Sequence, residues 1–431
     1  MKDLDMKNEI LERSTPLSRG DDLGFLVEKL RDKRVVMLGE ASHGTQEFYE
    51  WRKKISLELI RDHGFSFIAV EGDWPACQGI DSYVKGKSQD ALSTMRGFSR
   101  WPTWMWANTE ILELMDELRK LNESVADPAG FHGLDVYSLF ESLDEVLKML
   151  KSYDGDLRDK VEELYSCFEP YRHDERAYAR SLVKFPQGCR KEVTQALKEI
   201  LAARLQDGEK VFDLEQNARI IREAEQYYAA MVSLEDDSWN VRDQHMMTTL
   251  EDLLSHYGEG SKAIVWAHNT HIGDYRATDM LVRGEVNLGG LARQRFGEEN
   301  VALIGFSTYE GEVIASHAWD GPTQKLKIPP GKPESLEEIL HGLVPQIGAS
   351  HYFVNLKNAD SHSSLRKVIG HRAIGVIYYP ELEQRGNYVP TIPAGRYDGL
   401  IFCDRTKALE PLNVKFAKEK IPESYPFGTR I

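Results

Sequence analysis

Short runs of consecutive apolar residues recur along the chain, and the first is followed by a stretch with helical periodicity. Residues 35–38 are all apolar, which is typical of a short strand buried on both faces of a sheet. Residues 45–63 then carry apolar side chains every three or four positions, which indicates an amphipathic helix. A second apolar run at 65–70 completes a strand–helix–strand unit. Such units pair their strands in parallel and are almost always right-handed.

Short apolar runs that alternate with helical stretches continue to the C-terminal part of the chain and predict the remaining strands of a sheet. Further strands are expected at 131–135, 263–267, 301–306, 352–354, 373–379 and 399–403. Further helices are expected at 23–30, 108–121 and 286–296. Residues 321–333 are rich in Pro, Gly and Lys and are expected to form a surface loop.

Residues 138–257 differ from the remainder because strand signals are absent and the apolar residues keep helical spacing. We interpret this part as a helical insertion that packs on the sheet, adds no strand to it and walls one side of a cleft. The predicted fold is α/β, with three layers and a mainly parallel central sheet. Residues 1–137 and 258–431 form its two parts. Four polar residues beside the helical stripe are interpreted as solvated surface, with a position facing the cleft as the alternative: Asn240, Arg242, Asp243 and His245.

Candidate catalytic groups follow three of the predicted strands. Glu40 and His43 come after the first strand, Glu71 after the second, and His268 and His271 after the strand at 263–267. The carboxyl ends of parallel strands meet at one edge of the sheet, where ligands bind in open α/β folds. Chance easily places one histidine after a strand, but less easily two carboxylates and three imidazoles at one edge. We therefore expect His43, Glu71 and His268 to share a cleft, at direct or water-mediated hydrogen-bond distance.

The Glu40–His43 turn, and a cluster of three tryptophans further along the chain, each have a purely structural interpretation as well as a functional one. Glu40 and His43 would be solvated turn residues if Ser42 merely capped the following helix. The tryptophans at 101, 104 and 106 would be core packing, or else an apolar wall over a bulky substrate. Arg52, on the helix after His43, would pair with a carboxylate or stabilise an oxyanion.

Composition narrows the classes of partner. The formal charge of −15 argues against nucleic acid and anionic membranes as partners, and favours a neutral or cationic small molecule. The four cysteines have no metal-binding spacing and are expected to be buried thiols in a reducing compartment. The charged N-terminus resembles no signal peptide, and no apolar run is long enough to span a bilayer, so a cytoplasmic location is expected. The oligomeric state is left open.

The sequence contains no competing nucleophile or cofactor motif. There is no G-x-S-x-G elbow, no phosphate loop and no G-x-G-x-x-G after a strand, so no cofactor is expected. His268 and His271 lack the H-E-x-x-H context of a zinc protease. The simplest interpretation is a base that activates water without a metal. A metal-dependent hydrolase that uses the same Glu and His residues as ligands is the alternative.

Four stretches resemble the erythromycin esterase family. They are LGEASHGTQEF at 38–48, IAVEGDW at 68–74, AHNTHIGD at 267–274, and GVIYYPELEQRGNY at 375–388 with YDGLIFCDRTKALEPL at 397–412. The resemblance runs from the first strand to the last, and some members of the family carry a label that refers to succinoglycan biosynthesis. In fold the sequence also resembles the haem-binding ChaN proteins.

The resemblance implies hydrolysis of a carboxylic ester, or of a macrocyclic lactone such as a macrolide antibiotic, without a covalent intermediate. The general base falls on His43, and the carboxylates beside it on Glu40 and Glu71. The helix arginine falls on Arg52, and the paired histidines on His268 and His271. The alternative outside the enzymes is a binder of haem or of another small molecule on the same fold.

Overall fold

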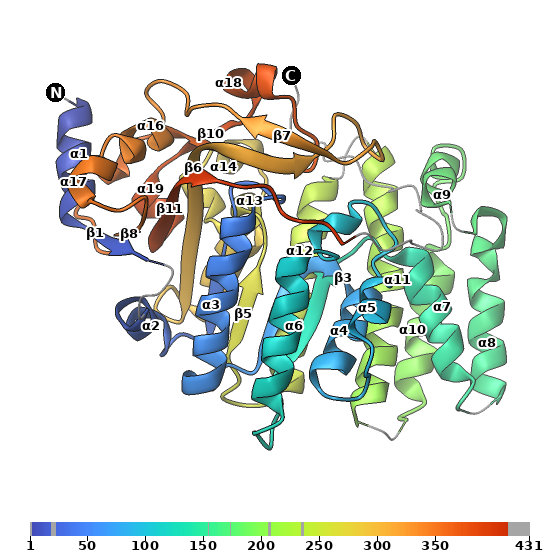
Figure 1. The fold of residues 1–431 in the computed structure, drawn as a ribbon. Helices are drawn as coiled ribbons and strands as arrows, with labels where there is room; N and C mark the ends of the chain where they lie inside the picture. Colours follow the sequence, from blue (N-terminus) through green and yellow to red (C-terminus); the bar gives the residue numbers. More distant parts are fainter. Residues whose placement is uncertain are drawn as a thin grey trace.

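A mixed, mostly parallel sheet forms the centre of the molecule (Figure 1). The computed structural model describes residues 2–18, 23–153, 155–172, 174–205, 208–233 and 237–412. The sheet strands are β1 Ser14–Leu17, β2 Val35–Leu38, β3 Phe67–Asp73, β4 Gly130–Asp135, β5 Ala263–Trp266, β6 Val301–Ala315, β7 Gln324–Ile328, β8 His351–Asn355 and β11 Gly399–Thr406. Their order is β1-β8-β11-β6-β2-β5-β3-β4, and β7 pairs with β6.

The strands from β11 to β4 are parallel, whereas β8, β1 and β7 add to the sheet in antiparallel fashion. In β2, Val36 and Leu38 enter one apolar core and Val35 and Met37 enter another, and all four are fully buried. A strand with a core on each face needs apolar residues at every position, which explains its unbroken apolar run.

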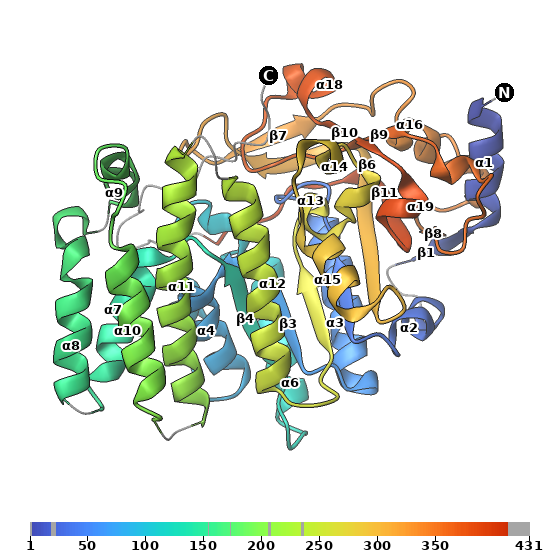
Figure 2. The same cartoon turned by 180° about the vertical axis from the view of Figure 1, so that it is seen from behind.

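Helices cover both faces of the sheet and make the three expected layers. Helices α3 Gln46–His63, α4 Trp74–Val84 and α6 Thr109–Asn122 lie in front of it in Figure 1, and α12 Ser238–His256 and α15 Leu288–Phe296 lie in front of it from behind (Figure 2). The other helices on or around the sheet are α1 Lys2–Glu12, α2 Gly24–Leu30, α5 Ala91–Met95, α13 Asn269–Ile272, α14 Met280–Arg283, α16 Leu336–His341, α17 Val344–Ile347, α18 Glu383–Gly386 and α19 Pro393–Arg396.

The segment predicted to be helical lies beyond the β4 edge of the sheet (Figures 1 and 2). Its helices are α7 Leu139–Leu150, α8 Gly155–Tyr165, α9 Glu175–Leu182, α10 Arg190–Ala202, α11 Gly208–Val232 and α12. Its described residues contain no strand. The first five pack around a core of their own, whereas α12 packs on the sheet.

Two predicted elements at the C-terminal part of the chain are wrong. Residues 373–379 alternate between buried and half-buried positions as a strand would, but they form no strand. Their backbone instead pairs with turns, through single bridges from Ser42 to Ile374 and from Ser316 to Ile377. Residues 321–333 are not merely a loop, because β7 alternates Lys and apolar residues within them and pairs with the distal half of β6. A separate two-stranded sheet joins β9 Ile369–Arg372 to β10 Tyr388–Thr391.

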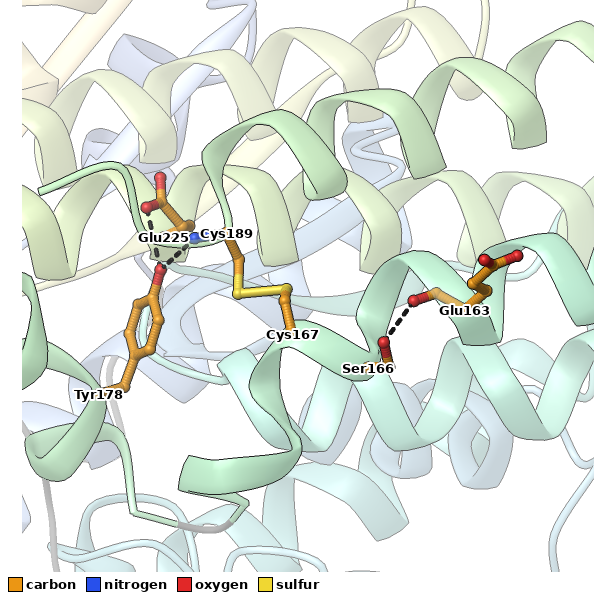
Figure 3. Close-up of a disulfide and its surroundings, with 6 residues drawn as sticks. All are labelled: Glu163, Ser166, Cys167, Tyr178, Cys189 and Glu225. Atoms are coloured by element: carbon orange, nitrogen blue, oxygen red, sulfur yellow. Dashed lines mark hydrogen bonds between the residues drawn. A yellow bond between two sulfur atoms is a disulfide. The ribbon is translucent and has the colours of Figure 1, made fainter. Parts of the chain in front are cut away.

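The expectation of four free thiols is also wrong. Cys167 and Cys189 form a disulfide within the helical segment, close to the Tyr178 hydroxyl that the Cys189 backbone N–H contacts (Figure 3). Cys77 and Cys403 are buried and form no disulfide, as expected. The pairing joins residues 22 positions apart with no recognisable motif between them, so it depends on how α9 and α10 fold back. No described helix is both long enough and apolar enough to cross a membrane.

Candidate active site

Glu40 and His43 form a buried pair on the turn between β2 and α3. Their exposed fractions are 1% and 8%, and His43 Nδ1 lies 2.9 Å from Glu40 Oε1. An ionised carboxylate only accepts hydrogen bonds, so Nδ1 carries the hydrogen and Nε2 of the neutral ring keeps a free lone pair. The interpretation as solvated turn residues is therefore wrong, and Ser42 is not the helix cap, since α3 begins after Thr45.

Arg52 supports this pair from inside the protein. Its side chain is fully buried between the rings of Tyr49 and Trp266, and its Nη2 donates a 2.7 Å hydrogen bond to Glu40 Oε2. The two oxygens of Glu40 are thus divided between a histidine and a guanidinium. Arg52 neutralises Glu40 and does not line a cleft.

Asn269 fixes the position of the Glu40 turn against two neighbouring strands. Its backbone N–H donates to the Glu40 carbonyl at 2.9 Å, and its side-chain amide makes two hydrogen bonds with the backbone of Phe306. A Cβ on Gly39 would lie 2.1 Å from Asn269 Oδ1, so this close approach requires glycine. In the sequence this asparagine stands out only as part of the AHNTHIGD motif. Its role in holding the Glu40 turn was not predicted.

His268 lies beside His43, with ring centroids 4.8 Å apart. Its Nδ1 accepts the Thr270 backbone N–H and lies 2.8 Å from the Thr270 hydroxyl, so the hydrogen of the neutral ring resides on Nε2. Burial holds the pKa of His268 well below its usual range, against the opposing effects of the Glu71 charge and the Ala41 backbone carbonyl. Nε2 is buried and makes no hydrogen bond of acceptable geometry to the described residues. The Ala41 carbonyl is thus at most a weak acceptor for this N–H, and the His268 ring lies next to that of His43.

Glu71 links His268 to a second group of charges. Its Oε2 accepts the backbone N–H of His268 at 2.8 Å, and its Oε1 accepts from Arg242 Nη2 at 2.7 Å. Burial alone would raise the pKa of Glu71, but His271 and Arg242 hold it well below its usual range. Glu71 is therefore an anion that orients the His268 turn.

The helix α12 brings charged residues into the site, which the sequence interpretation placed on a solvated surface. Arg242 binds both oxygens of Asp135, at 2.6 and 2.9 Å, and its side chain is 11% exposed. Asp243 is fully buried and lies 2.9 Å from His271 Nδ1. His245 is buried too, and Asn240 is half-buried with hydrogen bonds to the backbone of residues 284 and 286. The surface interpretation was wrong because α12 packs against the sheet, which buries these side chains at the strand ends. The periodicity of the helix alone does not show what it packs against.

His271 is held as a cation inside this group. Burial opposes its ionisation, but Asp243 and Glu71 raise the pKa of His271 to about 9. Its Nε2 lies 3.3 Å from Glu71 Oε1, and its ring stacks on Trp239 at 4.5 Å. Arg242 Nη1, which can only donate, also lies 3.0 Å from Nε2 and opposes protonation of the ring, but the two carboxylates outweigh it. Charged side chains thus engage both ring nitrogens of His271.

The three tryptophans lie in the apolar core, with exposed fractions of 8% for Trp101, 2% for Trp104 and 5% for Trp106. Trp106 donates its indole N–H to the Glu71 carbonyl at 3.2 Å and so supports the site from below. Trp101 packs against Trp319, with centroids 4.8 Å apart. Their part in an apolar wall over a substrate stays a prediction.

The carboxylates that a metal would need are already engaged. Glu40 is shared by His43 and Arg52, and Glu71 by Arg242 and the His268 backbone. Within the described part of the chain, no group of three His, Cys, Asp or Glu side chains is arranged to hold a metal ion. This donor set fits proton transfer better than metal ligation.

Sequence comparison finds relatives over most of the chain. The family profile described as erythromycin esterase matches residues 60–406. A protein of Bacillus subtilis (strain 168), "Putative hydrolase YbfO", is 24% identical over 343 residues, which are 74% of each chain. Erythromycin esterase type II of Escherichia coli is 28% identical over 116 residues, which are 27% of this chain and 26% of that enzyme.

Solved structures of similar fold cover nearly the whole chain. A Bacillus cereus protein matches with a TM-score of 0.79 at 20% identity, covering 95% of this chain and 99% of its own. A succinoglycan biosynthesis protein matches at 0.77 and 17% identity, with the same coverage. A histidine-to-asparagine variant of erythromycin esterase EreC in its open conformation matches at 0.64 and 16%, covering 91% and 97%. These matches confirm the predicted α/β fold.

Proposed function

Because the chain belongs to the erythromycin esterase family, we propose that it hydrolyses a carboxylic ester or macrocyclic lactone with water activated by His43. The family and its hydrolase relatives support a hydrolase; the bond cleaved and the mechanism are our proposal. The observation that carries it is the buried Glu40–His43 pair, which leaves the lone pair on His43 Nε2, with the His268 ring beside it at a centroid distance of 4.8 Å.

In the first step, His43 Nε2 removes a proton from a water molecule as the water oxygen attacks the ester carbonyl carbon. Glu40 accepts the Nδ1 hydrogen bond throughout and stabilises the imidazolium that forms. Arg52 donates a charged hydrogen bond to the other oxygen of Glu40 and so holds the carboxyl group in place.

The carbonyl oxygen becomes negatively charged as the tetrahedral intermediate forms. The Nε2–H of His268 is a neutral, buried donor that needs no reorganisation to stabilise that oxygen. In the second step the carbon–oxygen bond to the alcohol breaks, and the His43 imidazolium returns its proton to the leaving oxygen. The products are a carboxylic acid and an alcohol, so one water is consumed per turnover.

The charges around Glu71 hold the His268 turn in place. Glu71 accepts the His268 backbone N–H and is itself fixed by Arg242, which Asp135 binds. The helical segment therefore takes part in the site through α12. These residues orient the donor and do not exchange protons with the substrate.

The experiment is a screen of the purified protein against aryl esters, aliphatic lactones and macrolides, with products identified by mass. A lactone should open to one product that is heavier by one water, and an aryl ester should give an acid and a phenol whose masses add up to ester plus water. We expect turnover of at least one class, its loss in His43→Ala, and its persistence after dialysis against a chelator. Turnover that stops on chelation and returns with added metal would instead favour a metal-dependent hydrolase. Absence of turnover on all three classes would contradict the proposal.

A further inference from the structure

A separate crevice lies at the opposite edge of the sheet from the candidate active site. Lys33 precedes β2, Asp398 precedes β11, and Asn355 ends the antiparallel strand β8 opposite Gly399, so all three lie at the amino ends of the parallel strands. The crevice is between this edge and α2, which Figure 1 shows at the end of the sheet away from α13. Its volume of about 120 Å³ corresponds to roughly four water molecules of about 30 Å³ each.

The rim of the crevice carries an excess of positive charge. Lys29, Lys33 and Lys357 line it, and Asp398 is the one carboxylate among the lining residues. Asp398 is already committed elsewhere, because its Oδ2 accepts from Arg293 Nη2 at 2.9 Å and from the Leu303 backbone N–H at 2.8 Å. Lys357 Nζ lies 3.7 Å from Asp398 Oδ1, which is too long for a hydrogen bond.

Two of the lysines share the crevice at close quarters. Lys33 Nζ donates to the Glu299 carbonyl, a neutral acceptor, and makes no ion pair with the two carboxylates that act on it, Asp398 and Asp32. Burial, and then the neighbouring Lys357 ammonium, lower the pKa of Lys33. Like charges held together in an acidic chain are costly unless an anion lies between them.

The floor of the crevice is apolar. Leu30, Ile304 and Phe353 line it, and each belongs to the buried core of the same face of the sheet. A bare inorganic anion would satisfy the lysines but not this floor. A molecule with an anionic head and a short apolar tail would satisfy both.

We propose that this crevice is a second ligand site, which binds the carboxylate of a short aliphatic acid between Lys33 and Lys357 with its tail on Leu30, Ile304 and Phe353. The site is independent of the proposed hydrolysis, since it lies at the other edge of the sheet. Its occupant is a small organic acid, and the size of the crevice limits the tail to a few carbon atoms.

The test is calorimetric titration of the full chain with acetate, butanoate, hexanoate and inorganic phosphate at constant ionic strength. We expect saturable binding of hexanoate, with affinity that rises up to about fourfold for each methylene group until the crevice is filled. Lys33→Met and Lys357→Met should each weaken it about tenfold or more, since each removes a charged hydrogen-bond donor. The control Lys148→Met removes an exposed lysine of α7 and should leave it unchanged, as should His43→Ala.

Four results would overturn the proposal. Hexanoate binding could be absent, or equally tight in the wild type and both crevice variants. It could be lost in His43→Ala, which would place it in the candidate active site. Phosphate could bind as tightly as hexanoate and depend on the same lysines, which would make the occupant a bare oxyanion. Thermal unfolding of each variant without ligand shows whether it is folded and so keeps the comparison valid.

Discussion

One oxygen of Glu40 faces His43 and the other faces Arg52, so we predict that Glu40→Gln moves the ring hydrogen of His43 and lowers activity. Arg52 has only donors, so the new amide oxygen must face Arg52 and the new NH₂ group must face His43. His43 Nδ1 then has to accept, which moves the ring hydrogen to Nε2. The residue keeps its size and its contacts, but the lone pair no longer faces the water.

The expected loss is that of a positioned base, about 10²–10⁴-fold in kcat. At 1.36 kcal/mol per factor of ten this is about 3–5 kcal/mol of transition-state stabilisation. Stability should fall as well, because Arg52 is fully buried and loses its counter-charge. Breaking a buried ion pair costs roughly 3–5 kcal/mol, and the remaining amide–guanidinium hydrogen bond places the expected loss at the lower end.

The assay combines kcat and KM on the best ester from the screen with ¹⁵N spectra of the histidine rings and urea unfolding at pH 7. The matched control is Glu47→Gln, a buried glutamate in the first turn of α3, whose Oε2 accepts from the Lys407 backbone. It should lose stability and keep kcat. The reasoning is refuted if Glu40→Gln keeps wild-type kcat, or if its His43 hydrogen still resides on Nδ1.

Three further predictions concern the same site. His43→Ala should lower kcat about 10²–10⁴-fold with little change in KM or in the unfolding midpoint; near wild-type turnover, with His268→Ala inactive, would move the base elsewhere. Because the pKa of His271 is raised from 6.5 to about 9, its stabilising effect is complete below pH 6.5 and is lost as the pH rises through 9. Urea unfolding should therefore show a drop between pH 7 and 9 that Asp243→Asn reduces, and an unchanged drop would contradict the assigned partner. Arg242→Met should lower the free energy of unfolding by roughly 3–5 kcal/mol and kcat along with it; unaltered kcat in the folded variant would show that Glu71 does not need this partner.

The apolar runs and the residues directly after them were readable from the sequence alone. A strand such as β2 is buried on both faces, so its four apolar residues identify it without knowledge of its neighbours. Parallel strands end at a common edge, so the rule that places Glu40, Glu71 and His268 near one another is general. The structure brings these three together with His43.

Other features of the site and of the fold depended on packing between distant segments, which the sequence alone does not show. The periodicity of α12 was visible, but not that Arg242 and Asp243 would face the ends of β3, β4 and β5. The alternation at 373–379 was visible as well, but a strand exists only where a partner backbone is available, and these residues meet turns. The Cys167–Cys189 bridge depends in the same way on how α9 and α10 fold back.

The sequence by itself determined the α/β class and the helical character of residues 138–257, because both follow from the local periodicity of apolar residues. It also determined which residue types follow each strand, because these are adjacent to the apolar runs. Only the tertiary structure decided which nitrogen of each histidine carries the hydrogen, and that Arg52 faces Glu40 from inside the core. The partners are only two, three and twelve residues apart in the sequence, but whether their side chains meet depends on the shape of each turn and on the core packed around it, which local periodicity does not describe.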